Sequence, residues 1–211
     1  MITRNYVIKN PAVPNLLLAP VGYEQHYQDQ LNNALRLYFN QIENFGRALL
    51  GTHGTTYLKA PYASYYTTTT QTAAAINTAY PINLDPAVFE NGISLGTPAS
   101  RVYVSNSGIY NFQFSLQLAK SNASVGNVWI WYRVNGVDAP YSASQIAVQG
   151  ANAQTIAAWN FLVELKSGDY FELMWAVDDT HVQIIAYPAT AFAPAIPPVI
   201  MTVTFVSALT T

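Results

Sequence analysis

The residues that could act as general bases are few and scattered. The chain has three histidines, His26, His53 and His181, and none lies in a recognisable nucleophile motif. A serine or cysteine hydrolase needs a nucleophile, a base and an orienting group held together, and this chain has no cysteine. We therefore expect His26 and His53 to be solvated or to lie at an interface.

Paired carboxylates would offer a second chemistry, the hydrolysis of glycosidic bonds. The clustered acids lie late in the chain, at Glu164, Asp169, Glu172, Asp178 and Asp179. Their spacing alone brings no two of them to a catalytic separation. There is no glycine-rich phosphate loop either, because the glycines are isolated. We predict a protein that is not an enzyme and carries no cofactor.

One short segment has the residue types of a metal site. Asp178, Asp179 and His181 place oxygen and nitrogen ligands within four residues. Calcium, however, takes six to eight oxygen ligands, and the spacing of a calcium-binding loop is missing. We interpret the segment as an acidic turn between strands and assign no metal ligand to it, although ion binding there stays open.

Aromatic side chains are the remaining candidates for recognition, since the chain has 4 Trp and 15 Tyr and exposed aromatics stack on sugars. Trp129 and Trp131 share one face of a predicted strand, which favours packing in the core or on a threefold axis. Aromatics in loops are better candidates for contact with a partner. These are Tyr141, Tyr187 and Phe192.

The composition is hydrophobic and poor in charge. Of 211 residues, 51% are hydrophobic and only 9% are charged, with 9 Lys and Arg against 11 Asp and Glu. Disordered chains combine low hydrophobicity with high charge, so this chain should fold. It has no basic surplus for nucleic acid and no apolar run long enough to insert in a membrane. A surface so poor in charge favours an assembly component that is covered by other chains.

Residues 1–22 are predicted to be an extended anchoring arm. Pro11, Pro14 and Pro20 prevent a continuous helix and bracket the apolar run Leu16, Leu17 and Leu18. We expect these three leucines to lie in a groove on a partner. The alternative, a tail packed on the chain's own domain, is equally consistent with the pattern.

Residues 23–54 are predicted to form a coiled-coil-like helix followed by a turn. Apolar residues recur at alternating spacings of four and three, the period of a coiled-coil seam, and aromatics at one core position suit a trimer. A helix packed on its own domain is the alternative. The seam consists of Leu31, Leu35, Tyr38, Ile42, Phe45 and Leu49.

Residues 55–211 are predicted to form a jelly roll or β-sandwich. Residues 109–118 alternate apolar and polar side chains, and Asn135-Gly136 is a hairpin turn signal. Many short strands without a helix between them argue for this fold class. The other predicted strands are 101–105, 128–134, 145–148, 154–165, 170–175, 182–186 and 199–206.

Three segments of this region resemble the C1q/TNF-like jelly rolls. They are Gly108–Leu116 (GIYNFQFSL), Trp131–Gly136 (WYRVNG) and Leu165–Leu173 (LKSGDYFEL), although the last strand lacks the usual ending of that superfamily. The resemblance implies a homotrimer whose aromatic faces meet at the threefold axis.

The whole chain, including its helix segment LRLYFNQI (residues 35–42), further resembles uncharacterised proteins of marine and freshwater bacteriophages. The resemblance implies a structural virion protein, exposed on the particle as a capsid decoration, head fibre or short tail fibre. Its partners would be two further copies of itself and a capsid or tail protein. A protein that binds host-surface glycans, or a secreted lectin-like adhesion module, is the alternative, but no export signal is seen.

Overall fold

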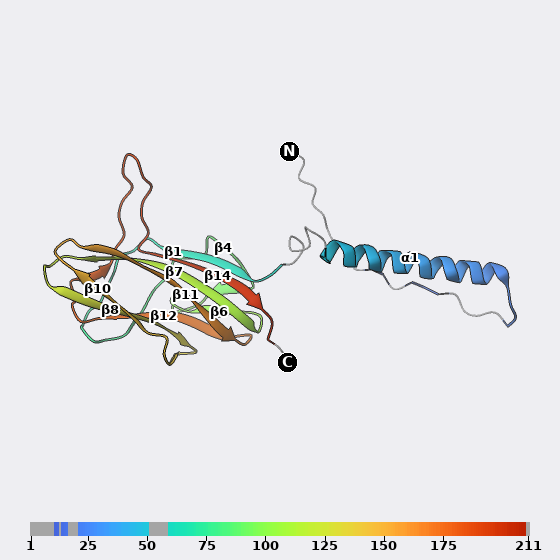
Figure 1. Cartoon of the computed structure of the whole chain (residues 1–211), viewed down its shortest axis with the longest axis horizontal. Coiled ribbons are helices and arrows are strands. Elements are labelled where there is room, and N and C mark those ends of the chain that lie inside the picture. Colours follow the sequence, from blue (N-terminus) through green and yellow to red (C-terminus); the bar gives the residue numbers. More distant parts are fainter. Residues whose placement is uncertain (1–10, 13, 17–20, 51–58, 210–211) are drawn as a thin grey trace. The chain divides into compact units, whose positions relative to one another are not determined.

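The computed structural model describes residues 11–12, 14–16, 21–50 and 59–209, except for the side chain of Leu50. The chain divides into two compact units, Met1–Lys59 and Ala60–Thr211 (Figure 1). The first unit contains the helix and the second contains all the strands. His53, Leu17 and Leu18 lie outside the described residues.

The helix α1 runs from Gln25 to Leu50, close to the predicted segment. Pairs of side chains one turn apart line its polar surface, including Arg47 with Glu43 and Gln28 with Asn32. None of its described side chains is buried. None of the described helices is long and apolar enough to cross a membrane.

The second unit consists of short strands joined by turns and loops. The longer strands extend over the segments in which polar and apolar residues alternate in the sequence. The strands are β1 (Tyr62–Thr67), β2 (Gln71–Thr72), β3 (Tyr80–Pro81), β4 (Phe89–Asn91), β5 (Ile93–Leu95), β6 (Val102–Val104), β7 (Gly108–Lys120), β8 (Val125–Val134), β9 (Val137–Asp138), β10 (Ser144–Gln149), β11 (Gln154–Leu165), β12 (Tyr170–Val177), β13 (Val182–Ile184) and β14 (Val199–Ser207).

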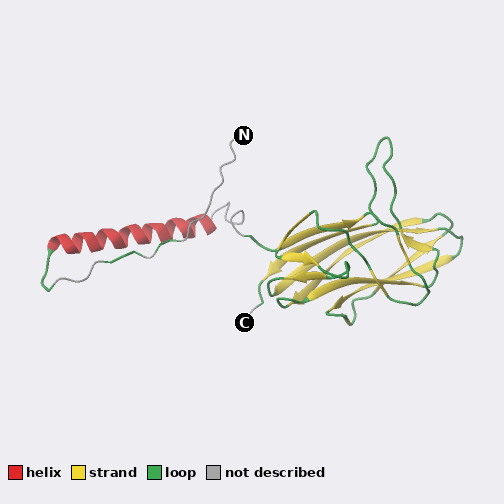
Figure 2. Ribbon diagram, turned by 180° about the vertical axis from the view of Figure 1, so that it is seen from behind, coloured by secondary structure: helices red, strands yellow, loops and turns green. Residues whose placement is uncertain are grey.

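These strands form two antiparallel sheets that face each other (Figure 2). The first sheet contains β11, β7, β14, β1 and β4, with β13 and β2 at one end. The second sheet has the order β10-β8-β12-β6-β5, with β3 on β12 and β9 on β8. In chain order, the eight principal strands are β1, β6, β7, β8, β10, β11, β12 and β14. The first sheet contains the first, third, sixth and eighth of them, and the second sheet contains the other four. This is the strand order of a jelly roll, and it confirms the predicted fold class.

The core lies between the two sheets and is rich in aromatic rings. Strand β7 turns alternate residues inward, and every second residue from Gly108 to Lys120 is buried. The ring of Phe112, from the first sheet, stacks on that of Phe171, from the second, with centroids 3.9 Å apart. Tyr132 extends the stack, since its ring centroid lies 5.5 Å from that of Phe171. The two sheets are therefore joined by a continuous aromatic layer.

Candidate binding surfaces

Trp129 and Trp131 lie on the outer face of the second sheet. In β8 the inward positions belong to Val128 and Ile130, which are fully buried, whereas the two tryptophans between and after them are partly exposed. The prediction that these tryptophans pack in the core is therefore wrong, and the alternative, packing on a threefold axis, stays a prediction. Side chains alternate between the two faces of a strand. The signal that could have placed the tryptophans on the outer face is the aliphatic pair Val128 and Ile130, which alternates with them.

The two tryptophans line a shallow pocket of about 480 Å³, which we call the aromatic platform. Its residues come from β8, β12, the hairpin after β8 and the segment before β3. Four of them are alanines. The platform consists of Asn77, Ala79, Trp129, Trp131, Asp138, Ala139, Tyr141, Ala143 and Ala176.

Asp138 is the charged residue of the aromatic platform. Its Oδ1 accepts hydrogen bonds from Trp131 Nε1 at 2.5 Å and from Arg133 Nε at 2.6 Å. These bonds, that of Arg133 first, hold the pKa of the Asp138 carboxyl below its usual value. The hydrogen bond to Asp138 likewise raises the pKa of Arg133. The platform therefore carries one carboxylate that is already paired with one guanidinium.

Tyr141 is held at the rim of the platform by an unusual turn. Its φ is +60° and its side chain is fully exposed. A bulky residue rarely adopts this left-handed conformation, which often marks a functional position. Ser142 supports the turn by donating a 2.8 Å hydrogen bond to the carbonyl of Ala139. The structure thus brings one of the three predicted recognition residues to the two tryptophans.

The other two predicted recognition residues lie together in the segment between β13 and β14. Tyr187 and Ile196 form an antiparallel bridge at its base, and the segment projects from the sandwich as a narrow hairpin (Figure 1). Phe192 lies in this hairpin and is 92% exposed. No residue between Tyr187 and Ile196 is charged. The hairpin is a second, separate surface that is available for contact.

The acidic segment after β12 is occupied by protein donors. Lys120, whose side chain is fully buried, donates to the carboxylate of Asp179, and Ser124 donates to the same oxygen at 2.8 Å. The Lys120 hydrogen bond, followed by that of the His181 amide, lowers the pKa of Asp179. Asp178 accepts from Asn127 N and Nδ2, both at 2.6 Å. The predicted solvated turn is thus an ion-pair cluster that closes one end of the sandwich.

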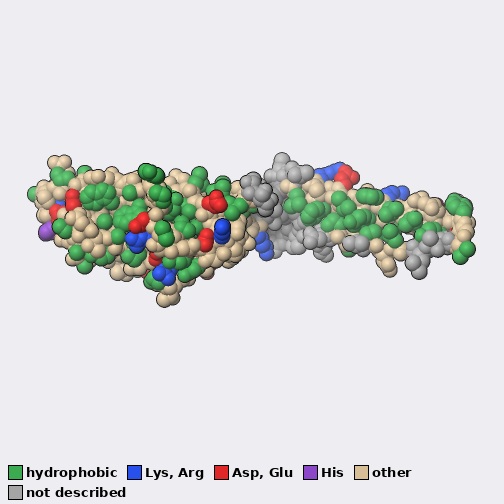
Figure 3. Space-filling model, turned by 90° about the horizontal axis from the view of Figure 1, so that it is seen from below, with side chains coloured by type: hydrophobic (Ala, Val, Ile, Leu, Met, Phe, Trp, Pro, Cys, Tyr) green, Lys and Arg blue, Asp and Glu red, His purple; other side chains and the backbone are tan. Residues whose placement is uncertain are grey.

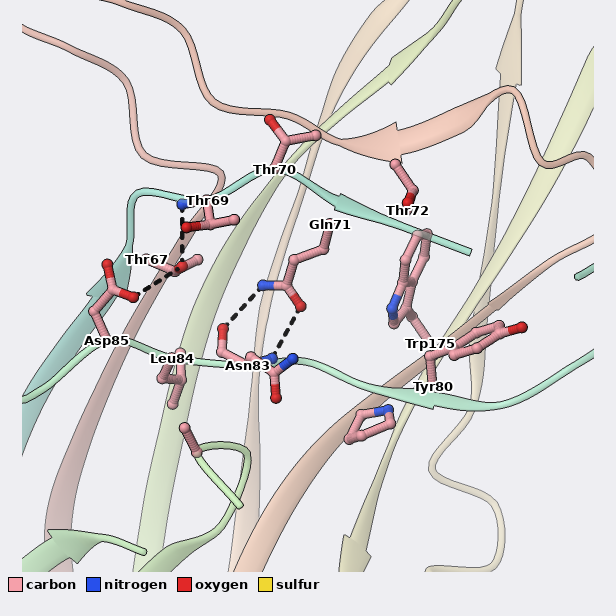
Figure 4. A pocket seen from close by; sticks show the side chains of 12 residues that line it. Thr67, Thr69, Thr70, Gln71, Thr72, Tyr80, Asn83, Leu84, Asp85 and Trp175 are labelled. Atoms are coloured by element: carbon pink, nitrogen blue, oxygen red, sulfur yellow. Dashed lines mark hydrogen bonds between the residues drawn. The ribbon is translucent and has the colours of Figure 1, made fainter. Parts of the chain in front are cut away.

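A second pocket, of about 560 Å³, lies between Thr67–Thr72, residues 80–85 and Trp175 (Figure 4). Its polar groups are used within the protein. The Gln71 amide bonds to both backbone groups of Asn83 at 2.9 Å, and Asp85 accepts from the backbone and side chain of Thr68. Trp175 is only 1% exposed, so its ring offers no open face. This pocket suits a ligand less well than the aromatic platform does.

The outer face of the first sheet is nearly free of charge. Cross-strand pairs there are polar or apolar, such as Asn160 with Asn111, whose amides bond at 2.9 Å. Among the outward positions of β11, β7, β14 and β1, all within the described residues, only Glu164 is charged. Several large apolar side chains are exposed on this face. They are Tyr62, Tyr66, Ile156, Leu162, Ile200 and Val206.

The outer face of the second sheet, by contrast, carries charged groups. Glu172 is 6% exposed and accepts hydrogen bonds from Ser100 Oγ at 2.8 Å and Arg101 Nε at 3.4 Å. The Arg101 guanidinium also lies 4.6 Å from the centroid of the Tyr170 ring. The sandwich therefore has one charged and one uncharged outer face. Figure 3 shows a side of the molecule where the few charged side chains lie among hydrophobic and uncharged polar groups.

The predicted seam runs along α1 without being buried. Leu31, Leu35, Tyr38, Phe45 and Leu49 are partly exposed, and Ile42 is 40% exposed. The seam residue Tyr38 and its neighbour Leu37 line a shallow groove with Ala12 and Pro14 of the leader. This part of the leader thus lies on the helix of its own unit, while Leu16 is 46% exposed.

Comparison with known proteins finds no matching family model and no matching curated protein. Among solved structures the fold is similar to a TNF from S. frugiperda, described as the structure of Eiger TNF. The TM-score is 0.49 at 10% sequence identity, and the match covers 72% of this chain and 97% of the TNF chain.

Proposed function

We propose that the protein is a homotrimeric structural component of a bacteriophage particle, in which the N-terminal unit anchors the chain and the jelly roll faces outward. The observation that carries the self-association is the open seam of α1. A helix gains most of its stability from packing an apolar face, and in a single copy none of the six seam residues is buried.

The uncharged outer face of the first sheet supports the same proposal. Interface cores are depleted of charged residues, and this face has one charged outward position on four strands. Two such faces can meet without removing water from ionised groups, which costs several kcal/mol for each unpaired ion. The jelly roll and the helix would thus associate through separate apolar surfaces.

Placement on a virion rests on the sequence resemblance to bacteriophage proteins. Leu16, which is exposed, and the neighbouring Leu17 and Leu18 are the residues that we assign to the contact with a capsid or tail protein. The helix and the leader would then provide both the register of the trimer and its anchor. No catalytic step enters this function, which is mechanical.

Two measurements, made one after the other, test the proposal. Light scattering coupled to size-exclusion chromatography should give the mass of three 23.2 kDa chains, and a stable monomer would exclude self-association. Deletion of residues 1–22 should leave a folded trimer that no longer enters particles. Unchanged incorporation of this variant would show that the leader is not the anchor.

Attachment to a host surface is a second candidate, which the aromatic platform favours. Partly exposed tryptophans on an outer sheet face are costly to leave in water, and Trp129 and Trp131 line an open pocket there. Imaging of the intact particle, with the protein labelled, distinguishes a tail position from a capsid position.

A further inference from the structure

We propose that the aromatic platform is a saccharide-binding site for neutral oligosaccharides. Sugar rings have C–H groups on their flat sides, and the face of an indole carries the negative part of the ring quadrupole that attracts such groups. Trp129 and Trp131 supply two such rings on one strand face, partly exposed and next to each other. This assignment rests on the second candidate function above and specifies its ligand class.

The pocket lies over the two indoles, where several of their neighbours are small or polar, although the buried Met174 lies opposite Trp131 on β12. Across the strand pairs, Trp129 lies opposite Ala176 on β12 and Gln145 on β10. Ala143, which is exposed, precedes β10 beside Trp131. A large side chain at either alanine would cover the rings, whereas alanine leaves a pocket of about 480 Å³ above them.

The spacing of the tryptophans suits a chain of sugars better than a single ring. Residues two apart on a strand are separated by roughly 7 Å, so adjacent indoles form an elongated surface. Tyr141 extends this surface at the rim, and its exposed ring is held by a turn with a fixed φ of +60°. A preformed arrangement of rigid aromatic side chains reduces the entropy lost on binding.

The polar groups at the platform suit hydroxyl groups. Asp138 keeps unused acceptor capacity beyond its bonds to Trp131 and Arg133, because a carboxylate has about four lone-pair positions. Asn77, which also lines the platform, adds an amide. Since the one carboxylate is paired with Arg133, the site has no positive surplus for an acidic sugar. Uncharged sugars fit this balance best.

A second copy of the chain fits the platform less well than a saccharide does. The nearby outer face of the second sheet holds the ion pairs Arg133–Asp138 and Arg101–Glu172, which a protein interface would have to desolvate. The uncharged face for self-association lies on the other sheet. A few polar groups around an otherwise apolar concave surface are typical of a small-ligand site.

The test uses the full chain on an array of neutral and acidic oligosaccharides, followed by titration with the best-retained one. Trp131→Ala should weaken binding about tenfold or more, the effect of losing one stacking contact. Ala143→Leu removes no contact but covers the ring of Trp131, and it should weaken binding similarly. Ala147→Leu, at an exposed outward position of the strand β10 that follows Ala143 but outside the platform, is the matched control and should bind like the wild type.

Several outcomes would overturn this assignment. They are the retention of no oligosaccharide, the retention of acidic ones only, and equal binding by the wild type and the Ala143→Leu variant. Loss of self-association by Ala143→Leu would instead identify the platform as a contact between copies. Because the mass of the assembly is measured separately, failure of sugar binding leaves the trimer proposal standing, and the reverse also holds.

Discussion

Trp131 and Asp138 are joined across the hairpin that follows β8, where the indole nitrogen donates a 2.5 Å hydrogen bond to the carboxylate. The hairpin turns at Asn135 and Gly136, whose φ values of +51° and +81° match the tight turn that this residue pair favours. The register pairs Arg133 with Asp138, which places one carboxylate between a guanidinium and an indole. The orientation of Trp131 is therefore set by a local turn.

Replacement of Asp138 by Ala should change the orientation of Trp131 more than it changes stability. The Asp138 side chain is 55% exposed, and an exposed ion pair contributes at most about 1 kcal/mol. We expect the near-ultraviolet circular dichroism of tryptophan to decrease, while urea unfolding gives a nearly unchanged free energy. A loss of several kcal/mol would mean that the pair is buried by a contact between chains.

Replacement of Asp179 by Ala should destabilise the sandwich strongly. The Lys120 side chain has no exposure, and removing its partner leaves a buried charge, which costs about 3–5 kcal/mol. The double variant Lys120→Met, Asp179→Ala should recover most of this loss because no charge then remains in the core. Urea unfolding measures both, with the exposed Glu164→Gln as the control. Equal losses in the single and double variants would contradict the ion-pair explanation.

Stability should fall at both acid and alkaline pH. The pKa of Asp179 is lowered in the folded chain, so its contribution is present above the ordinary value of 3.8 and is lost as the pH falls below it. Burial, followed by the charge of Glu90, raises the pKa of Tyr65, whose contribution is present below the ordinary value of 10 and is lost above it. Thermal unfolding across pH 3–11 should show a plateau between these limits. The Asp179→Ala variant should lose much of the acid dependence.

Replacement of Ser115 by Arg should dissociate the assembly without unfolding the chain. Ser115 lies on the outer face of β7, between Ala158 and Ile200 of the neighbouring strands. A guanidinium there stays solvated in a single copy but would be buried, unpaired, between copies. Light scattering should show monomers for this variant and trimers for Ala147→Arg on the second sheet. A trimeric Ser115→Arg variant would remove this face from the interface.

Replacement of Phe192 by Ser should leave the stability unchanged. Its ring is 92% exposed, and substitutions at such positions change the free energy of unfolding by about 0.5 kcal/mol or less. An aromatic ring so exposed is available for contact with a partner. Thermal unfolding of the full chain checks the unchanged stability, with Ala191→Ser in the same hairpin as control. A clear decrease in melting temperature would show that Phe192 packs within the assembly.

The strands after residue 100, except the two-residue β9, could be predicted from the sequence because their inward and outward residues alternate, whereas β1 (Tyr62–Thr67) and the short strands β2 to β5 lie outside the predicted strands. The predicted strand 109–118 is observed as Gly108–Lys120, and the predicted strand 154–165 has the same bounds in the structure. The extension of β7 to Lys120 was missed, since a lysine is rarely an inward residue. Its partner Asp179 lies 59 positions away, and spacing along the chain gives no sign of that pairing.

Only part of the candidate site could be predicted from the sequence. The loop position of Tyr141 predicts that it contacts a partner. The shared strand face of Trp129 and Trp131 predicts instead that they pack in the core or on a threefold axis. Both outer and inner faces of a strand show the same period of two, so the period alone cannot say which side is the core. The burial of Val128 and Ile130 shows that these positions of β8 point into the core, and Trp129 and Trp131, which alternate with them, therefore point outward.

In the proposed trimer, the open seam of α1 also makes the helix sensitive to dilution. If its apolar residues are covered only by identical chains, the free energy that holds the helix together includes the entropy of bringing three molecules into one. The jelly roll, in contrast, buries its own aromatic core, in which the rings of Phe112 and Phe171 stack within one chain. In dilute solution the helix would therefore unravel first, and only a crowded or immobilised set of chains, as on the surface of a particle, would keep it folded.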